Sequence, residues 1–162
     1  MTVKFQGNNV TLIGKELKVG DKLDNFVVVD NSLNEVSLDS LKGKKVFLTV
    51  PSLDTPVCDL EVKTFNKRAS EIKDLAGIYT ISLDLPFAQS RWCGQNGIEK
   101  VKTFSDYKYH EFAKATSTYI KELGLLTRAI FIVDENNTLV FVKYLEEITN
   151  EPNYDEILDE LK

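Results

Sequence analysis

Cys58 is the residue whose position most suggests chemistry, because it lies in the first turn of a predicted helix. The helix follows the apolar run Val46–Val50, and Pro56 suits its first position. A thiolate at a helix N-terminus is favoured by the unpaired N–H groups there and can act as a nucleophile. Asp54 and Asp59 oppose the anion, so such a nucleophile also needs a basic partner from elsewhere in the fold.

A second interpretation of Cys58 needs no chemistry. Free cysteines are among the most buried residue types and often serve as small apolar side chains. The chain has two cysteines, Cys58 and Cys93, which lie 35 residues apart and form no Cys-x-x-Cys pair. In a reducing compartment such a pair is either two buried thiols or a transient, catalytic disulfide. Composition alone favours the buried thiols.

Arg128 is the best candidate for the basic partner. It precedes the apolar strand Ala129–Val133, and the alternation of side chains along a strand puts it on the face of Ile130 and Ile132. A charged side chain at the end of a central strand either reaches solvent or meets a specific anion. The sequence leaves both possibilities open.

Thr55 suits the N-cap position of the same helix, where its hydroxyl can accept a backbone hydrogen bond. The hydroxyl lies three residues before Cys58, so it can also face the space above the helix N-terminus and form one hydrogen bond there. The two roles do not exclude each other.

Other polar residues fit structural roles better. Arg68 falls on the charged face of the helix, Arg91 lies in the segment around Cys93, and His110, the only histidine, has no motif around it. A Cys-His protease mechanism is therefore disfavoured. Two cysteines and one histidine without close spacing make no zinc or iron–sulfur site, so we expect no metal.

The helix itself is predicted by the spacing of its apolar residues. After Pro56 they recur at intervals of four, three, four and three, which is one buried stripe: Cys58, Val62, Phe65, Ala69 and Ile72. The polar residues between them predict a solvated face: Asp59, Glu61, Lys63, Asn66, Lys67, Arg68 and Glu71.

The elements around the helix predict the fold class. The strand Val46–Val50, the helix and a strand at Gly77–Asp84 form a βαβ unit, which predicts parallel strands at the centre of a sheet. The other predicted elements are a β-hairpin of Thr2–Phe5 and Val10–Ile13, a strand at Phe26–Val29, a loop or short irregular helix at Leu85–Gly97, a strand at Val101–Phe104, a short helix at Tyr107–Lys114, a hairpin of Ala129–Val133 and Thr138–Tyr144, and a final helix from Tyr154 to Leu161 capped by Asn150 or Asn153. This order is typical of a thioredoxin-like α/β fold with a central mixed sheet, flanking helices and an added N-terminal hairpin.

Length and composition set further limits. The 162 residues contain no repeat or linker, so we expect one domain, residues 1–162. The net charge of −5 argues against a nucleic-acid partner, which usually meets a basic face. No apolar run approaches the roughly 20 residues that a membrane span needs, and the N-terminus lacks the apolar core of a signal peptide. We therefore expect no membrane association and a cytoplasmic location.

Several motifs together resemble a known family. The pattern Pro51-x-x-x-Thr55-x-x-Cys58, between a buried strand and a helix, resembles the active-site motif of peroxiredoxins. Four segments have amino-acid sequences similar to those of the bacterial thiol peroxidase branch, the atypical two-cysteine type: residues 50–58, 84–94, 124–129 and 147–152. The likeness covers nearly the whole chain in the expected order.

The resemblance implies roles for five residues. Cys58 resembles the peroxidatic cysteine, which a peroxide oxidises to a sulfenic acid, and Cys93 resembles the resolving cysteine, which forms a disulfide with it in the same chain. Thr55 and Arg128 resemble the residues that hydrogen-bond the sulfur and the peroxide oxygens, and Pro51 resembles the proline that shields the pocket. The resemblance further implies an antioxidant peroxidase for hydrogen peroxide and organic hydroperoxides. Such enzymes form homodimers, are reduced by thioredoxin and use no metal or organic cofactor.

Two positions depart from the usual pattern of this branch. Position 56 is Pro where Gly is more usual, and Trp92 stands where Phe is the more usual neighbour of the resolving cysteine. Pro56 stiffens the start of the helix and is expected to slow the local unfolding that brings Cys58 to Cys93. Two other functions stay open at this point: a peroxide-responsive redox sensor that uses the same disulfide, and a binding module whose thiols are inert.

Overall fold

A mixed β-sheet forms the centre of the computed structural model, which describes residues 1–72 and 75–161. Within these residues the sheet has seven strands, in the spatial order β11 (Leu139–Tyr144), β10 (Ala129–Val133), β5 (Lys44–Thr49), β6 (Leu75–Ser82), β7 (Val101–Ser105), β3 (Val27–Val29) and β4 (Glu35–Ser37). Strands β5, β6 and β7 are parallel, and the outer strands are antiparallel to their neighbours. The predicted mixed sheet with a parallel centre is therefore confirmed.

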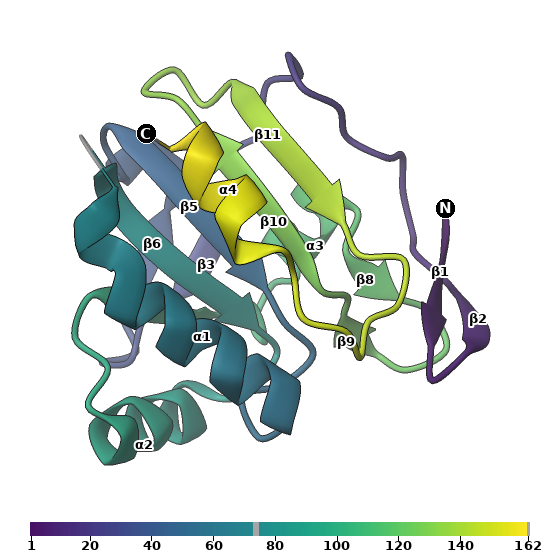
Figure 1. Cartoon of the computed structure of the whole chain (residues 1–162), viewed down its shortest axis with the longest axis horizontal. Helices are drawn as coiled ribbons and strands as arrows, with labels where there is room; N and C mark the ends of the chain where they lie inside the picture. Colours follow the sequence, from purple (N-terminus) through teal and green to yellow (C-terminus); the bar gives the residue numbers. More distant parts are fainter. Residues whose placement is uncertain (73–74, 162) are drawn as a thin grey trace.

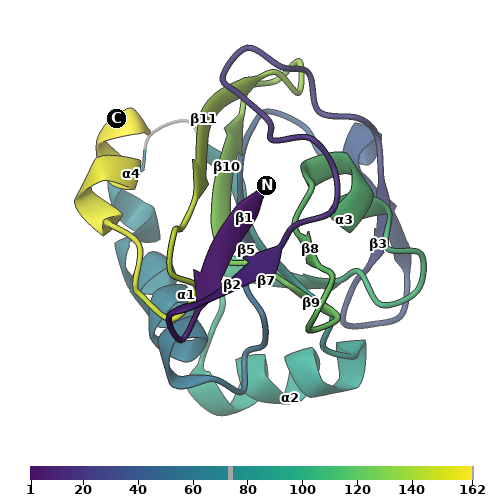
Figure 2. The same cartoon turned by 90° about the vertical axis from the view of Figure 1, so that its right-hand side faces the viewer.

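Helices cover both faces of the sheet (Figure 1). Helices α1 (Pro56–Arg68) and α4 (Tyr154–Glu160) lie on one face, and α3 (Glu111–Thr116) lies on the other, as the side view in Figure 2 shows. Helix α2 (Pro86–Asn96) lies beside the N-terminal half of α1. Short 3₁₀ turns occupy Leu38–Ser40 and Ala69–Glu71, and a small two-stranded sheet joins β8 (Tyr119–Ile120) to β9 (Leu125–Leu126).

Strict alternation along the central strands divides the core into two parts. On β5, Val46 and Leu48 pack with α1 and α4, whereas Phe47 packs with α3. On β10, Ile130 packs toward α1 and Phe131 toward α3. Both faces of these strands are buried, which is why their sequences read as continuous apolar runs.

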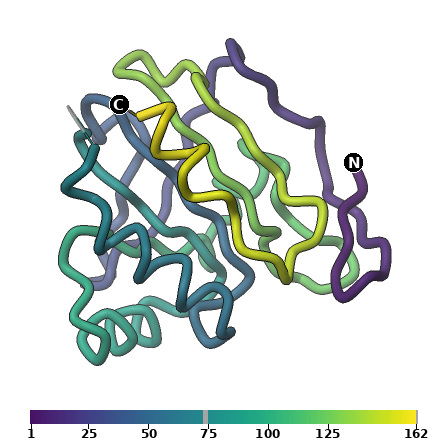
Figure 3. Tube along the Cα trace, in the orientation of Figure 1, coloured from purple at the N-terminus to yellow at the C-terminus, as the bar shows by residue number. Residues whose placement is uncertain are grey.

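The N-terminal hairpin stands apart from the main sheet. Strands β1 (Thr2–Phe5) and β2 (Asn8–Thr11) are joined by the two-residue turn Gln6–Gly7, shorter than the four-residue turn that the sequence suggested. The hairpin lies beside the loop that follows β11 (Figure 3), where Lys4 forms a β-bridge with Glu147. The N-terminal hairpin and the loop after β11 thus meet beside the start of α1.

Two predicted elements differ in the structure. Leu85–Gly97 was predicted as a loop or short irregular helix. It contains a regular helix, Pro86–Asn96, which starts at a proline and ends at Gly97 in the left-handed conformation, with φ 62°. The sequence of this helix shows no apolar stripe, because its buried positions are only Pro86, Gln89 and Trp92. Helix α3 begins at Glu111, four residues later than predicted, after a His110 with positive φ. No helix in the described part of the chain is long and apolar enough to span a membrane.

Candidate active site

The loop between β5 and α1 is held in place by Asp84, which follows the neighbouring strand β6. One carboxylate oxygen of Asp84 accepts a hydrogen bond from the Ser52 hydroxyl at 2.7 Å. The other accepts from the backbone N–H of Leu53 at 2.9 Å. Because β5 and β6 are parallel, their carboxyl ends lie at one edge of the sheet and bring the two loops together. The start of α1 is therefore fixed from the adjacent strand.

Thr55 occupies the N-cap position of α1, but its side chain does not cap the helix. The backbone is extended, with φ −97° and ψ 146°, and Pro56 takes the first helical position, as predicted. The hydroxyl of Thr55 instead donates to the carbonyl of Ser52 at 2.9 Å, so the predicted side-chain cap is wrong. Among the described residues, no protein acceptor meets the backbone N–H groups of Val57 and Cys58. These two donors are free for a ligand.

Cys58 is the third residue of α1 and is fully buried, with 0% exposure. It packs in the same cluster as Val62 and Phe65 of its own helix, as the predicted stripe requires. Ile130 of β10 belongs to this cluster too. The burial that favoured an inert thiol is therefore real, and the neighbours of the sulfur decide whether it is reactive.

Arg128 is the neighbour that matters most for the sulfur. It is 2% exposed and lies on the side of the sheet that α1 covers, as the alternation along β10 predicts. Its guanidinium donates to the Cys58 Sγ at 2.9 Å, to Glu61 at 2.5 Å and to the carbonyl of Ile148 at 2.7 Å. Burial lowers the pKa of Arg128, but Glu61 and Cys58 outweigh this effect and leave the pKa above its ordinary value. A permanent cation therefore lies against the sulfur of Cys58.

Glu61 was assigned to the solvated face of α1, and that assignment is wrong. Its side chain is 0% exposed, and one carboxylate oxygen binds Arg128 while the other has no hydrogen-bond partner. Burial raises the pKa of Glu61 to about 7, although the attraction of Arg128 pulls it down. Glu61 lies three residues after Cys58 and four before Phe65, so helical spacing places it on the buried stripe. That spacing was the available signal, and the charge of the residue obscured it.

A small cavity opens above the N-terminal end of α1. It has a volume of about 230 Å³, and Pro51, Thr55, Val57 and Arg128 line its inner part. The sulfur of Cys58 lies behind this lining, in contact with Arg128. The structure thus brings four of the predicted site residues to one place: Pro51, Thr55, Cys58 and Arg128.

Cys93 does not join that group. It lies on α2, is half-buried, and its sulfur is 3.5 Å from the hydroxyl of Thr103 on β7. It lines a different cavity, of about 390 Å³, whose other walls include Asn31, Tyr79 and Ile98. Both cysteines are free thiols. The two sulfurs thus have different hydrogen-bond partners, Arg128 for Cys58 and Thr103 for Cys93.

A hydrogen bond links the two helices that carry the cysteines. The indole N–H of Trp92, the residue before Cys93, donates to the carboxylate of Asp59, the residue after Cys58, at 2.8 Å. Asp59 also forms an ion pair with Lys63 at 2.8 Å, one turn further along α1. The departure at position 92 thus gives the structure a contact that a phenylalanine lacks.

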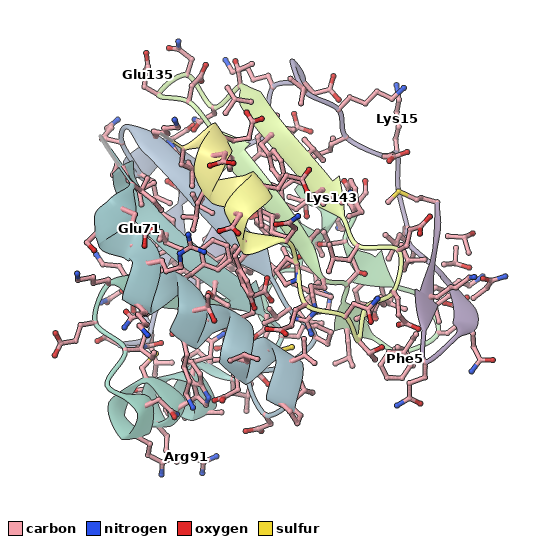
Figure 4. All side chains as sticks on the ribbon, in the orientation of Figure 1. Phe5, Lys15, Glu71, Arg91, Glu135 and Lys143 are labelled. Carbon is pink, nitrogen blue, oxygen red and sulfur yellow. The ribbon has the colours of Figure 1, made fainter. Side chains whose placement is uncertain are left out.

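The weaker candidates remain outside the site. Arg68 pairs with Glu71 and Asp155 at the surface, and Arg91 points into solvent (Figure 4). His110 precedes α3, where its ring packs against Tyr119. The cavity above α1 therefore combines a buried sulfur, one permanent cation and free N–H donors. Such an arrangement suits attack by a thiolate on a small electrophile whose leaving group departs as an anion.

Comparisons with known proteins agree with this geometry. Residues 18–158 match the family model described as Redoxin. The chain is 61% identical over 158 residues to a thiol peroxidase of Clostridium acetobutylicum, covering 98% of this chain and 96% of that protein. It is 49% identical over 161 residues to a thiol peroxidase of Bacillus subtilis, covering 99% of this chain and 96% of that one. The crystal structure of a peroxiredoxin-like protein from Aquifex aeolicus superposes with a TM-score of 0.91 at 41% identity, covering 99% of this chain and 95% of the other.

Proposed function

Since the chain belongs to the redoxin family, we propose that Cys58 is the residue that a peroxide oxidises. Within this family the chain belongs to the bacterial thiol peroxidases, an atypical two-cysteine peroxiredoxin group. The protein is a peroxidase, and this activity implies a peroxide as substrate and a thiol as reductant. The further proposals concern the residues, the order of the steps and the identity of the reductant. The single observation that carries them is the 2.9 Å contact between the Arg128 guanidinium and the Cys58 sulfur.

In the first step the thiolate of Cys58 attacks one oxygen of a hydroperoxide. A sulfur–oxygen bond forms, the O–O bond breaks, and Cys58 becomes a sulfenic acid. The other oxygen leaves as an alkoxide or hydroxide, which takes a proton and departs as an alcohol or water. Arg128 and the free N–H groups of Val57 and Cys58 are placed to stabilise the charge that grows on the oxygens. Thr55 and Pro51 line the same cavity, and we propose that Pro51 shields the sulfur from water.

In the second step the thiol of Cys93 condenses with this sulfenic acid. A disulfide forms between the two sulfurs and one water is released. A disulfide needs Cα atoms roughly 4.4–6.8 Å apart. The two sulfurs now have different hydrogen-bond partners, Arg128 for Cys58 and Thr103 for Cys93. We propose that the first turn of α1 unwinds, and that the hydrogen bond between Asp59 and Trp92 breaks as α2 rearranges.

A dithiol then returns the disulfide to two thiols by exchange, and we propose thioredoxin for this role. The surface around the starts of α1 and α2 carries exposed apolar side chains, with Leu60, Leu85 and Phe87 at 47%, 52% and 68% exposure. Such side chains are common at protein interfaces, so this surface supports docking of a redoxin or of a second copy in a homodimer. We place the cycle in the reducing cytoplasm, where both thiols stay available. The sensor alternative is not favoured, because the relatives above are peroxidases.

Thiol mapping by mass spectrometry tests the proposed roles. Wild type, Cys58→Ser and Cys93→Ser are each treated with stoichiometric peroxide and digested without reductant. We expect a disulfide between residues 58 and 93 in wild type, and an oxidised Cys58 without disulfide in Cys93→Ser. Peroxide consumption by Cys58→Ser at the rate of wild type would refute the mechanism. Arg128→Lys is expected to slow the oxidation of Cys58 about 10²-fold, because one ammonium cannot keep all three contacts of the guanidinium.

A further inference from the structure

The outer wall of the cavity above α1 comes from the N-terminal hairpin and from the loop after β11. Phe5 and Gln6 of the N-terminal hairpin line it, together with Ile148 and Thr149 of the loop after β11. Phe5 is half-buried and lies on the side of the hairpin that faces the rest of the molecule (Figure 4). Its phenyl group and the side chain of Ile148 give this wall an apolar character. Hydrogen peroxide has no group that could use such a wall.

Glu147 holds the hairpin turn against the cavity. Its carboxylate accepts hydrogen bonds from the backbone N–H groups of Gly7 at 2.7 Å and of Gln6 at 3.3 Å. It also accepts from Thr149 in its own loop, at 3.1 Å. Partial burial raises the pKa of Glu147, but the N–H donors of Thr149, Gly7 and Gln6 outweigh this and leave the pKa below its ordinary value. One carboxylate thus joins both halves of the outer wall.

The geometry of the turn explains why its N–H groups are available. Gln6 and Gly7 both have positive φ, 52° and 82°, which is the conformation of a tight two-residue hairpin turn. A glutamine adopts positive φ at a cost in free energy, so the turn needs support from its surroundings. The carboxylate of Glu147 supplies that support from a residue 141 positions away.

The hairpin keeps its own packing without Glu147. Val3, Val10 and Leu12 form a buried cluster with Ile120 and Ile148. Backbone bonds between Lys4 and the loop after β11 add to it, at 2.7 and 2.8 Å. Loss of the Glu147 side chain should therefore release the turn and the adjacent Phe5, and leave the hairpin folded on the protein.

We propose that Glu147 is a positioning residue that sets substrate preference, by holding Phe5 and Gln6 as the wall that contacts the organic group of a hydroperoxide. This inference rests on the proposed function of the same cavity and adds the determinant of its selectivity. The peroxide oxygens meet Arg128 and the helix N-terminus in either substrate, whereas only an organic hydroperoxide gains from the apolar wall. Contact with this wall therefore distinguishes the two substrates and takes no part in the chemical step.

Single-turnover oxidation of Cys58 by cumene hydroperoxide and by hydrogen peroxide tests this proposal. The quantity of interest is the ratio of the two second-order rate constants. In Phe5→Ala and in Glu147→Ala we expect the ratio to fall about 10-fold, the usual scale for loss of an apolar contact in a pocket. Glu147→Gln, which keeps one acceptor oxygen, should fall between wild type and Glu147→Ala. The control is Glu146→Ala at the neighbouring exposed position, which should keep the ratio of wild type.

The double variant Phe5→Ala/Glu147→Ala adds a readout that general destabilisation would not produce. If Glu147 acts through Phe5, the double variant loses no more selectivity than Phe5→Ala alone. An equal loss of both rates in Glu147→Ala, or an unchanged ratio in both single variants, would overturn the inference and leave the peroxidase function standing. A wild type that is oxidised at Cys58 by neither peroxide would overturn the proposed function, and this inference with it.

Discussion

Glu61 accepts a hydrogen bond from Arg128 at 2.5 Å, and the two side chains are 0% and 2% exposed. A buried pair of this kind costs desolvation energy, so it is weak support for stability as such. Its effect here is positional, because the guanidinium held by Glu61 is the one that contacts the Cys58 sulfur. The ion pair therefore connects the packing of α1 to the position of the guanidinium beside Cys58.

Removal of the Glu61 carboxylate should destabilise the fold. In Glu61→Ala the buried Arg128 loses its carboxylate partner, and breaking a buried pair usually costs about 3–5 kcal/mol. Urea unfolding at pH 8 measures this, with Glu71→Ala as the control, because Glu71 forms an exposed ion pair with Arg68. We expect a far smaller loss in the control. Equal losses in the two variants would show that burial of the Glu61 pair has no special effect.

The raised pKa of Glu61 predicts a pH dependence of stability. Because its pKa is about 7 in the folded protein and ordinarily 4.5, the folded state keeps a proton that the unfolded chain releases between these values. The stability from this group is therefore fully present below pH 4.5 and is lost as the pH rises through 7. Urea unfolding of wild type and Glu61→Gln from pH 4.5 to 8 isolates the effect. The advantage of wild type should shrink by up to about 3 kcal/mol, and an advantage that grows with pH would contradict the assignment.

The single tryptophan should report the formation of the disulfide. Trp92 is 8% exposed, and its indole N–H donates to Asp59 beside Cys58. If disulfide formation breaks this hydrogen bond, one equivalent of peroxide should change the tryptophan emission in two phases, oxidation of Cys58 and then rearrangement. Stopped-flow fluorescence measures both phases. Cys93→Ser should lack the second phase, and a second phase that survives in this variant would separate the emission change from the disulfide.

The alternation of apolar residues was enough to predict the sheet, the helix α1 and the side of the sheet that Arg128 faces. These features depend on local periodicity, which each segment carries within itself. Helix α2 was predicted only as a loop or short irregular helix, because its buried positions include the polar Gln89 and show no apolar stripe. Gln89 is buried only because its amide donates to Ser82 and to the carbonyl of Phe104, contacts between distant segments that the sequence does not display.

The residues of the site were predicted, but the contacts between them were not. The motifs pointed to Cys58, Thr55 and Arg128. In the structure Thr55 and Arg128 line one cavity, and Arg128 contacts the sulfur of Cys58. The sequence assigned Glu61 to solvent, because a carboxylate is rarely buried unless it is paired, and its partner lies 67 residues away. The direction of the Thr55 hydroxyl was wrong for a similar reason, since the carbonyl of Ser52 competes for it as an acceptor.

If the first turn of α1 unwinds as proposed, Pro56 should control how readily it does so. It occupies the first helical position, where φ is already fixed and the missing N–H costs nothing. On this proposal, the unwound turn that brings Cys58 to Cys93 gains less conformational entropy when it contains a proline. Replacement of a proline by glycine in such a place changes the balance by roughly 0.4–1 kcal/mol or more. We therefore expect Pro56→Gly to raise the rate of disulfide formation about 2- to 5-fold.

Rapid quenching after one equivalent of hydrogen peroxide measures the rate of disulfide formation directly. Excess peroxide gives a second measure, because a sulfenic acid that waits longer for Cys93 is oxidised further to the sulfinic acid. Pro56→Gly should accumulate less sulfinic acid at Cys58 than wild type at the same peroxide concentration. The matched variant Pro56→Ala should lie between the two, since alanine favours the helix more than glycine does. A slower resolution in Pro56→Gly would mean that the proline helps the turn to reach Cys93, and that unwinding does not limit the step.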